Sequence, residues 1–583
     1  MRKRNLFGHH YDVLSVRRLN KFFETKILGK GYLVFIILFI ICLLAFRNAF
    51  HLSLHGDDWQ IISTYWGKLG PKYGFLSPRL YIANYGFSNI TSILYKLFGN
   101  NSLYYNLLSL IFRTILAYGI YLFTKRFSTK TQSFIAALIF SLIAVGAQTT
   151  GWVFNMNAYI GIFFALMGVL LIIKLRDKSI WGLIICLVGY IIIPIRLYVL
   201  PPAIVLVELV KSYRDKQGLG QSIMYFTGRF FLISFLFLGL NILFPSIGFN
   251  ATYKGMIIAG IKSLTSKIAA GDYLVFISIF TNLGQMFFPD LLFLPVKSDI
   301  LKMISILFIG SLYLLAIGGV FGKKNVKGSI LASLSIFFIL LIVFRYFAQS
   351  EIDNNYFGWT YLGLVFFVGL ILKFKEVVAM KKTSELNLYF ILIIFIFSFL
   401  VPWLTEPGYL YATVFRYLIL PAVGLSIFFG KYVFNLDTRI NNFLYFSKVT
   451  LLILFVISQT TFLNNYLLRE LKARPDWLNK YFSNSLRELI PTIPTDSRSV
   501  FYFEDFDNDI YDSLLRFGFG YHMHILYKLP YNEKNFPISF SNISEIRQYV
   551  DSNSIPEENI FALRWEENRL VDITRETRRN VKF

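Results

Sequence analysis

The sequence predicts a polytopic α-helical membrane protein with about thirteen transmembrane helices, followed by a small extracytoplasmic α/β domain. Three observations predict this class. The chain has 583 residues, of which 55% are hydrophobic and 18% aromatic. Apolar runs of about 17 to 25 residues recur along it, which is the length that crosses about 30 Å of hydrocarbon. Beyond residue 467 the long apolar runs stop, and Asp, Glu, Asn and Pro become frequent.

The charge distribution gives the orientation of the spans. The net charge is +24, and much of it falls in short links between apolar runs, such as Lys125-Arg126 and Lys323-Lys324. Basic links of this kind mark the cytoplasmic side of a membrane, so the charge excludes a nucleic-acid partner and makes the bilayer the partner. Cys42 and Cys186 both lie inside apolar runs, so we expect buried thiols and no disulfide framework.

The basic links alternate with the apolar runs in a consistent pattern. The predicted spans are residues 32–50, 103–123, 132–148, 157–173, 180–195, 198–210, 223–244, 301–321 and 329–346, a tenth that ends near Lys373 and Lys375, and 388–404, 412–430 and 447–466. Residues 1–31 are then a cytoplasmic basic segment, with the first span an uncleaved signal anchor. Residues 32–466 form the membrane core with an external loop at 51–100, and 467–583 form an extracellular domain of a cell-membrane protein.

Two regions outside these spans also have predicted structure. The stretch from 244 to 300 is expected to hold partly buried, interfacial helices. In the carboxyl-terminal domain the stretch 498–503 predicts a buried strand, because it contains the β-branched Val500 followed by three aromatic residues. Further strands are predicted at 523–528 and 559–565, and helices at 476–489, 508–516 and 543–551.

The motif with the strongest chemical content is His55-Gly56-Asp57-Asp58-Trp59-Gln60, which follows the first span. Ionised groups beside hydrocarbon are costly, so a paired acid at this place is a candidate functional site. Burial and a like-charged neighbour would raise the pKa of one carboxyl group, which suits a general base that deprotonates a hydroxyl. The alternative is a solvated loop. His55 with Asp57 and Asp58 is also a set that can accept a divalent cation.

Basic residues recur at the ends of the predicted spans on the external side. They are Arg79 within Ser77-Pro78-Arg79-Leu80, Arg196, Arg345, and Arg416 with Tyr417. Together they predict a pocket for an anionic head group, since the planar guanidinium fork suits phosphate. Each alone is equally compatible with an anchor at the lipid interface. The chain has neither a phosphate-binding P-loop nor a Gly-rich dinucleotide motif, so the sequence requires no nucleotide or other cofactor.

The acidic motif resembles that of the GT-C glycosyltransferases, including lipid-dependent mannosyltransferases and protein O-mannosyltransferases. Gly56 stands where the family pattern has proline, and Asp58 where it has glutamate. The segment from Arg416 to Pro421 is similar to an Arg-Tyr element near the end of such membrane cores. The resemblance implies that Asp57 is the general base, with Asp58 as the fallback. His55, Trp59 and Gln60 of the motif are candidate substrate-binding residues. Trp152 and Asn155 are candidates too, although the loop that holds them lacks the extra acid that some members of the family have there.

The resemblance further implies a reaction. A sugar, hexosyl or pentosyl, moves from a polyprenyl-phosphate-linked donor to a cell-envelope glycan or lipid acceptor on the outer face. The donor phosphate leaves, and Arg79 or Arg416 stabilises its charge. Two alternatives stay open at this point: a transporter or flippase for lipid-linked glycans, and a glycan polymerase.

Overall fold

The computed structural model forms two compact units. Unit 1 comprises Met1–Ala45, Phe112–Ala147 and Ala158–Leu463, and unit 2 comprises Phe46–Ile111, Gln148–Asn157 and Asn464–Phe583. The structure describes residues 23–63, 94–99, 101–174, 179–214, 219–243, 261–271, 274–289, 299–317, 326–347, 354–399, 416–435, 442–516, 518–567 and 569–581.

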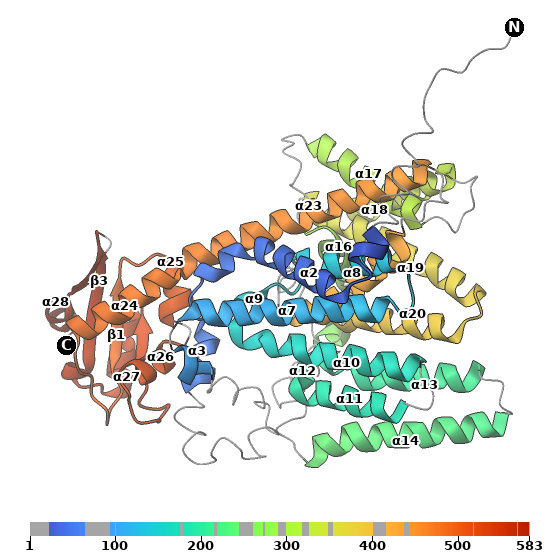
Figure 1. Ribbon diagram of the computed structural model, residues 1–583. Helices are drawn as coiled ribbons and strands as arrows, with labels where there is room; N and C mark the ends of the chain where they lie inside the picture. Colours follow the sequence, from blue (N-terminus) through green and yellow to red (C-terminus); the bar gives the residue numbers. More distant parts are fainter. Residues whose placement is uncertain are drawn as a thin grey trace, which may run out of the picture. The chain divides into compact units, whose positions relative to one another are not determined.

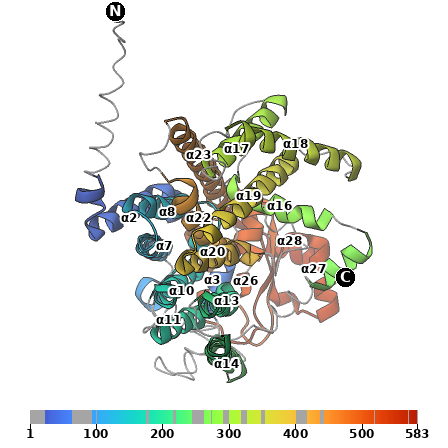
Figure 2. The same cartoon turned by 90° about the vertical axis from the view of Figure 1, so that its right-hand side faces the viewer.

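Unit 1 is built from helices (Figures 1 and 2). They are α2 (Gly31–Ala45), α8 (Lys130–Leu142), α11 (Ser179–Ile192), α12 (Pro194–Leu197), α13 (Leu200–Arg214), α14 (Leu219–Leu243), α16 (Leu274–Phe287), α17 (Asp299–Ile317), α18 (Val326–Phe347), α19 (Asn354–Ala379), α20 (Thr383–Ile396) and α22 (Ile419–Phe428). Three further helices have residues in both units: α7 (Ser102–Thr124), α10 (Asn157–Lys174) and α23 (Asn442–Ala473).

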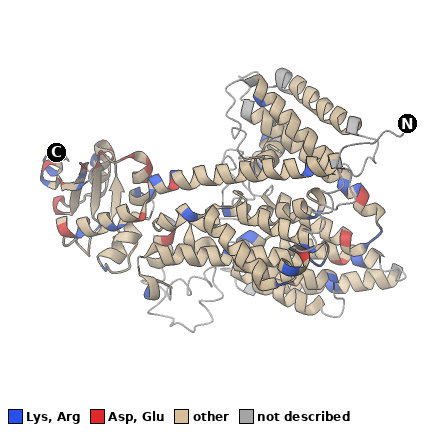
Figure 3. Ribbon diagram, turned by 45° about the horizontal axis from the view of Figure 1, so that its top comes forward, with Lys and Arg blue, Asp and Glu red and all other residues tan. Residues whose placement is uncertain are grey.

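Several helices in the described part of the chain have the length and composition of membrane spans. Six are long and apolar enough to cross a bilayer: Ser102–Thr124, Val153–Lys174, Gly220–Gly239, Ile300–Ile317, Arg416–Val433 and Phe443–Ala473. Charged residues are sparse along these helices (Figure 3). The chain is therefore a multi-pass membrane protein, as predicted. Every predicted span coincides with a helix among the described residues, while the number of helices that cross the bilayer stays a prediction.

The helix α2 illustrates how a span divides its surface. Its exposed side chains Tyr32, Ile36, Ile40 and Leu44 recur every fourth residue, and Val34, Leu38 and Cys42 on the other side are fully buried. An exposed apolar stripe of this kind faces lipid, because exposing a continuous apolar surface to water is energetically unfavourable. Cys42 and Cys186 are buried free thiols, which confirms the prediction for the cysteines.

Helices α16 and α19 approach each other closely through two glycines. A Cβ atom at Gly284 would lie 1.8 Å from the Trp359 carbonyl oxygen, and one at Gly363 would lie 1.7 Å from the Phe280 carbonyl oxygen. Small residues let helix backbones meet where lipid provides no hydrophobic drive for association. The long stretch from 244 to 300 thus holds, within its described part, a helix that is packed into unit 1.

The carboxyl-terminal part of unit 2 is an α/β domain with one mixed sheet. The four strands are β1 (Val500–Glu504), β2 (Ile538–Phe540), β3 (Ile560–Glu566) and β4 (Arg569–Asp572), in the order β2-β1-β3-β4. β1 pairs in parallel with β2 and β3, with Val500 opposite Ile538 and Ile560, and β3 pairs antiparallel with β4. The helices are α24 (Asp476–Leu489), α25 (Asn508–Ile510), α26 (Phe519–Leu526), α27 (Ile543–Asn553) and α28 (Thr574–Val581).

The sheet is covered on both faces because alternate side chains of β1 enter different cores. Phe501 and Phe503 pack with α24 and α26, whereas Val500 and Tyr502 pack with α27. This alternation is the period of two that a strand imposes on its side chains. Fully apolar strands buried on both faces are typical of parallel pairing.

Most of the predicted elements in this domain are confirmed, and one is wrong. The helices at 476–489, 508–516 and 543–551 and the strands at 498–503 and 559–565 are present within a few residues. The predicted strand at 523–528 is wrong, since residues 519–526 form helix α26. A short apolar run fits a buried helix as well as a strand, and Gly518 begins the helix here in a left-handed conformation.

We expect the substitutions Gly284→Ala and Gly363→Ala each to destabilise the protein by about 1–3 kcal/mol, because the added methyl group enters the facing backbone. Thermal unfolding of the detergent-solubilised protein measures the effect. Gly228→Ala in α14 is the control, since nothing lies within 4 Å of a Cβ at that position. Equal unfolding temperatures for all three variants would contradict the close packing of α16 and α19.

Candidate active site

The acidic motif forms the start of helix α3 (Gly56–Ser63) in unit 2. Asp58 is the third residue of this helix, and its Oδ2 atom accepts a hydrogen bond from the His55 backbone N–H at 2.8 Å. The Asp58 N–H in turn donates to the His55 carbonyl oxygen at 2.9 Å. An acid at the third position that bonds back to the preceding residue fixes where a helix begins.

The second oxygen of Asp58 is also engaged by the backbone. Its Oδ1 atom accepts the Phe154 N–H at 3.2 Å, and the side chain is fully buried. The carboxylate therefore joins the start of α3 to the segment η4 (Val153–Met156). Both carboxylate oxygens of Asp58 are thus engaged by backbone N–H groups. Asp57 lies one residue earlier in α3, and its side chain is outside the described part of the structure.

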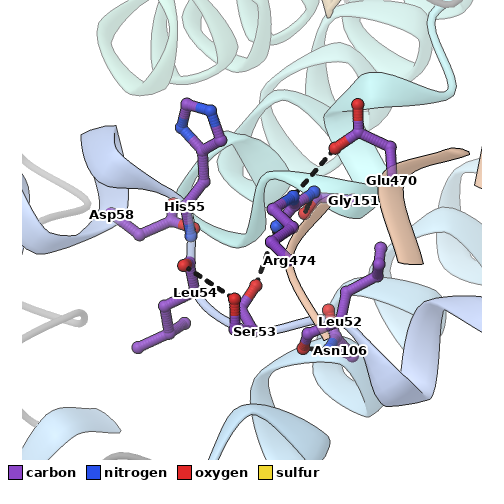
Figure 4. Close-up of polar contacts among 9 residues, drawn as sticks. All are labelled: Leu52, Ser53, Leu54, His55, Asp58, Asn106, Gly151, Glu470 and Arg474. Atoms are coloured by element: carbon purple, nitrogen blue, oxygen red, sulfur yellow. Dashed lines mark hydrogen bonds and ion pairs between the residues drawn. The ribbon is translucent and has the colours of Figure 1, made fainter. Parts of the chain in front are cut away.

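Arg474, just after α23, holds the segment before the motif (Figure 4). Its guanidinium donates to the Ser53 carbonyl at 2.7 Å, to the Gly151 carbonyl at 2.9 Å and to the Glu470 carboxylate at 2.8 Å. Burial acts to lower the pKa of Arg474, but Glu470, with a smaller contribution from Asp58, raises it above its usual value. The guanidinium is thus a permanent, fully buried cation between three segments.

Side chains near the amino-terminal end of helix α7 donate hydrogen bonds to the segment before the motif and to the segment around Thr150. Asn106 Nδ2 donates to the Leu52 carbonyl at 3.1 Å, and Ser109 Oγ donates to the Thr150 carbonyl at 3.2 Å. Both side chains are buried. Because a buried carbonyl without a donor is costly, these bonds allow the irregular backbone before the motif and around Thr150 to be buried.

Two ring stacks enclose α3. The His55 ring lies on Trp152 with centroids 3.6 Å apart and an angle of 19°. The Trp59 ring lies on His522 of α26 with centroids 4.2 Å apart and an angle of 10°. Of the predicted substrate residues, His55 and Trp152 therefore lie ring against ring, whereas Trp59 packs on the α/β domain. The Asn155 N–H donates to the Trp152 carbonyl at 2.9 Å in a local turn.

Further contacts bind α3 to the α/β domain. Ser63 Oγ is 2.9 Å from His524 Nδ1, and Gln60 Nε2 donates to the Tyr521 hydroxyl at 3.4 Å. Burial, with a smaller contribution from the charge of Arg487, lowers the pKa of His522 to about 3. Burial also lowers the pKa of His524. Both rings are therefore neutral at physiological pH, and they serve as packing groups and hydrogen-bond partners.

The backbones of α3 and α26 touch at two glycines. Gly518 has φ of 77°, and a Cβ atom built there would lie 2.3 Å from the Gly56 carbonyl oxygen. Gly56 stands where the GT-C pattern has proline. The departure from the pattern thus coincides with a point where the α/β domain contacts the motif directly.

A second group of predicted residues comes together in unit 1. Pro194 begins the short helix α12, which separates α11 from α13 and carries Arg196. The Arg196 guanidinium lies 3.8 Å from the centroid of the Tyr417 ring, and that of Arg416 lies 5.3 Å from the same centroid. Two guanidinium groups that share one ring form a concentrated positive charge, which an anionic group would offset.

The remaining predicted site residues are less informative. Arg79 lies outside the described residues, and Arg345 is in α18 with a side chain outside the description. Sequence analysis missed Arg474, Glu470, Asn106, Ser63, His522 and His524 as parts of the site. Glu470 and Arg474 do show one signal, a spacing of four residues that suits an ion pair on a helix, but nothing in the sequence marks them as buried.

No group of three or more His, Cys, Asp or Glu side chains among the described residues is arranged to hold a metal ion. Asp58 directs both carboxylate oxygens at backbone N–H groups, so it offers less to a cation than the sequence suggested. We derive no step through a metal.

No protein-family model and no curated protein sequence matches this chain. Solved structures do match. The Archaeoglobus fulgidus oligosaccharyltransferase AglB with an inhibitory peptide and a dolichol-phosphate has 13% identity and a TM-score of 0.43, over 92% of this chain and 69% of that one. Its apo form has 14% identity and a TM-score of 0.44, over 91% and 69%.

Apo ArnT from Cupriavidus metallidurans has 10% identity and a TM-score of 0.31, over 91% of this chain and 92% of that one. AglB and ArnT are GT-C membrane glycosyltransferases, the superfamily that the acidic motif resembles. With TM-scores below 0.5, these likenesses do not transfer chemistry to this chain, which has to be argued from its own residues.

We expect stability to depend on pH through His522. The unfolded ring has a pKa of about 6.5 and the folded ring one of about 3. The unfolded state therefore takes up the proton first, and stability falls as pH decreases from about 6.5 toward 3, by up to about 1.4 kcal/mol per pH unit. His522→Phe keeps a ring on Trp59 and should reduce this slope in thermal unfolding. Substitution of the exposed His51 is the control, and an unchanged slope in His522→Phe would contradict a neutral buried ring.

Gly518→Ala should destabilise the α/β domain more than Gly271→Ala destabilises its own segment. Both glycines have nearly the same φ, 77° and 78°, but only Gly518 has a backbone neighbour within 4 Å. The strain of a positive φ costs about 1–2 kcal/mol in both variants, so the excess in Gly518→Ala reports the contact with Gly56. Thermal unfolding of the two variants measures it, and equal losses would show that this contact is loose.

Proposed function

We propose that this chain is a glycosyltransferase that moves a sugar from a polyprenyl-phosphate-linked donor to a glycan or lipid of the cell envelope. The observation that carries the proposal is the rigid start of α3, where a buried Asp58 accepts two backbone hydrogen bonds and fixes the residue before it. Rigid support of this kind is what a reacting side chain needs for its geometry.

In this proposal Asp57 is the general base. It accepts the proton of the acceptor hydroxyl while the hydroxyl oxygen bonds to the anomeric carbon of the sugar. The bond between that carbon and the phosphate oxygen breaks, and polyprenyl phosphate leaves with the electron pair. Asp58 holds the motif and does not take the proton, which is the reverse of the fallback assignment.

The leaving phosphate needs positive charge that is already in place. Arg196 and Arg416, both on the Tyr417 ring, supply two guanidinium groups of the type that binds phosphate oxygens in pairs. Arg79 and Arg345 remain predicted contributors. The lipid chain of such a donor would lie in the bilayer against the exposed apolar side chains of the helices. A donor of this kind requires no nucleotide.

The glycan or lipid acceptor contacts the aromatic groups around α3. His55, Trp59, Gln60, Trp152 and Asn155 supply ring faces and amide groups, which are the side chains that bind sugar rings and hydroxyls. The orientation follows from the basic links: the amino terminus is cytoplasmic and the α/β domain is extracellular.

Membrane vesicles that contain the protein test the proposal. Vesicles are given radiolabelled polyprenyl-phosphate sugars, and label is followed into envelope polymers. Asp57→Asn should lower the rate of transfer by about 10²- to 10⁴-fold, because it removes the base, and should leave the unfolding temperature unchanged. Asp58→Asn should lower both, because an amide replaces one acceptor oxygen by a donor that faces a backbone N–H.

The comparison of the two variants with wild type decides between the classes of protein. Full transfer activity in both variants would contradict the assignment of Asp57 as the base and Asp58 as its support. Donor that crosses the bilayer equally in all three proteins, without any transfer, would indicate a flippase in which the acid pair is structural.

A further inference from the structure

Helix α16 in unit 1 carries a buried polar stripe. Ser278, Asn282 and Gln285 are each at most 2% exposed. They are spaced by four and three residues, so they share one side of the helix within an arc of about 60°. Polar side chains within a membrane unit are costly and mark places where polar ligands bind.

The amides of this stripe are left unsatisfied by the protein. Within the described residues, neither Oε1 nor Nε2 of Gln285 has a hydrogen-bond partner, and neither does Oδ1 of Asn282. A buried polar atom without a partner lowers stability, whereas an apolar group of the same shape does not. Leucine at these positions would therefore give a more stable native fold. The presence of the amides has to be explained by something other than stability, such as ligand binding.

The position of α16 itself is secured by other groups. Gln459 of α23 accepts the Ala144 N–H at 3.0 Å and donates to the Met286 and Phe287 carbonyls at 3.0 and 3.2 Å. Thr281 and Thr360 bond to each other at 2.8 Å. Gln459 is thus a buried glutamine with a structural role, and Gln285 is one without.

We infer that the stripe of Ser278, Asn282 and Gln285 binds the sugar of the lipid-linked donor, an inference that rests on the proposed function. A sugar hydroxyl both donates and accepts hydrogen bonds, as do amide and hydroxyl side chains, and the stripe carries no charge that would select an ion. A donor anchored by its lipid partitions into the bilayer and reaches a helix packed among membrane spans. A soluble saccharide does not concentrate there.

Gln285→Leu, Asn282→Leu and the matched variant Gln459→Leu test the inference in detergent-solubilised full-length protein. The probes are polyprenyl phosphate carrying glucose, mannose, N-acetylglucosamine or arabinose, and bare polyprenyl phosphate. One readout is the rise in unfolding temperature that each probe produces. The other is KM and kcat for transfer in vesicles.

For wild type we expect at least one sugar-bearing probe to raise the unfolding temperature more than the bare lipid. Gln285→Leu and Asn282→Leu should lose this difference, raise KM about tenfold, leave kcat unchanged, and unfold at the wild-type temperature or above. Gln459→Leu should unfold at a lower temperature and keep the difference between the probes.

The outcomes separate this inference from the proposed function. Wild-type vesicles that transfer no sugar would overturn the proposed function. Active wild type with unchanged KM and probe discrimination in Gln285→Leu would overturn the inference alone. It is equally overturned if wild type does not distinguish sugar-bearing from bare lipid, or if Gln285→Leu loses as much stability as Gln459→Leu.

Discussion

The candidate site in unit 2 depends on one buried cation. Arg474 donates to the carbonyls of Ser53 and Gly151 and to the carboxylate of Glu470, which joins three segments that are far apart in the chain. Hydrogen bonds to a charged group contribute about 1.5–3 kcal/mol each, so this one side chain stabilises the backbone just before the acidic motif and the backbone at Gly151. The stack of His55 on Trp152 and the bond of Asp58 to the Phe154 N–H join the same two segments.

The class of fold follows from the sequence because its causes are local. Apolar runs of the length of a bilayer and basic links between them do not depend on tertiary contacts, and helices occur at every predicted span. Helix α24 and strand β1 were also predictable from their own residues. The error at 523–528 arose because the Met-His-Ile-Leu run satisfies a strand and a buried helix equally, and only its packing against α3 distinguishes them. The three-residue strand β2 exists only because β1 pairs with it.

The sequence predicted the parts of the site whose residues are neighbours in the chain, and it did not predict the parts that come from distant positions in the chain. The sequence located the motif from His55 to Gln60 and named Trp152, and it grouped Arg196 with Tyr417 from their similar places at span ends. It named Asp57 as the base with Asp58 as the fallback, and the two hydrogen bonds that Asp58 accepts from the His55 and Phe154 N–H groups favour this order. Arg474 and His522 could not be found, since an arginine at a helix end and a histidine in a polar domain look like solvated residues until their partners are known.

The bond from Arg474 to Ser53 also sets an order in time. The two residues are separated by 421 positions, so a ribosome that adds about 5–20 residues per second makes Ser53 about 20–80 s before its partner. The acidic motif is therefore delivered to the membrane long before the groups that shape it exist. A nascent chain therefore carries the two acids before their supporting groups are made, and the site can form only after Arg474 has been synthesised.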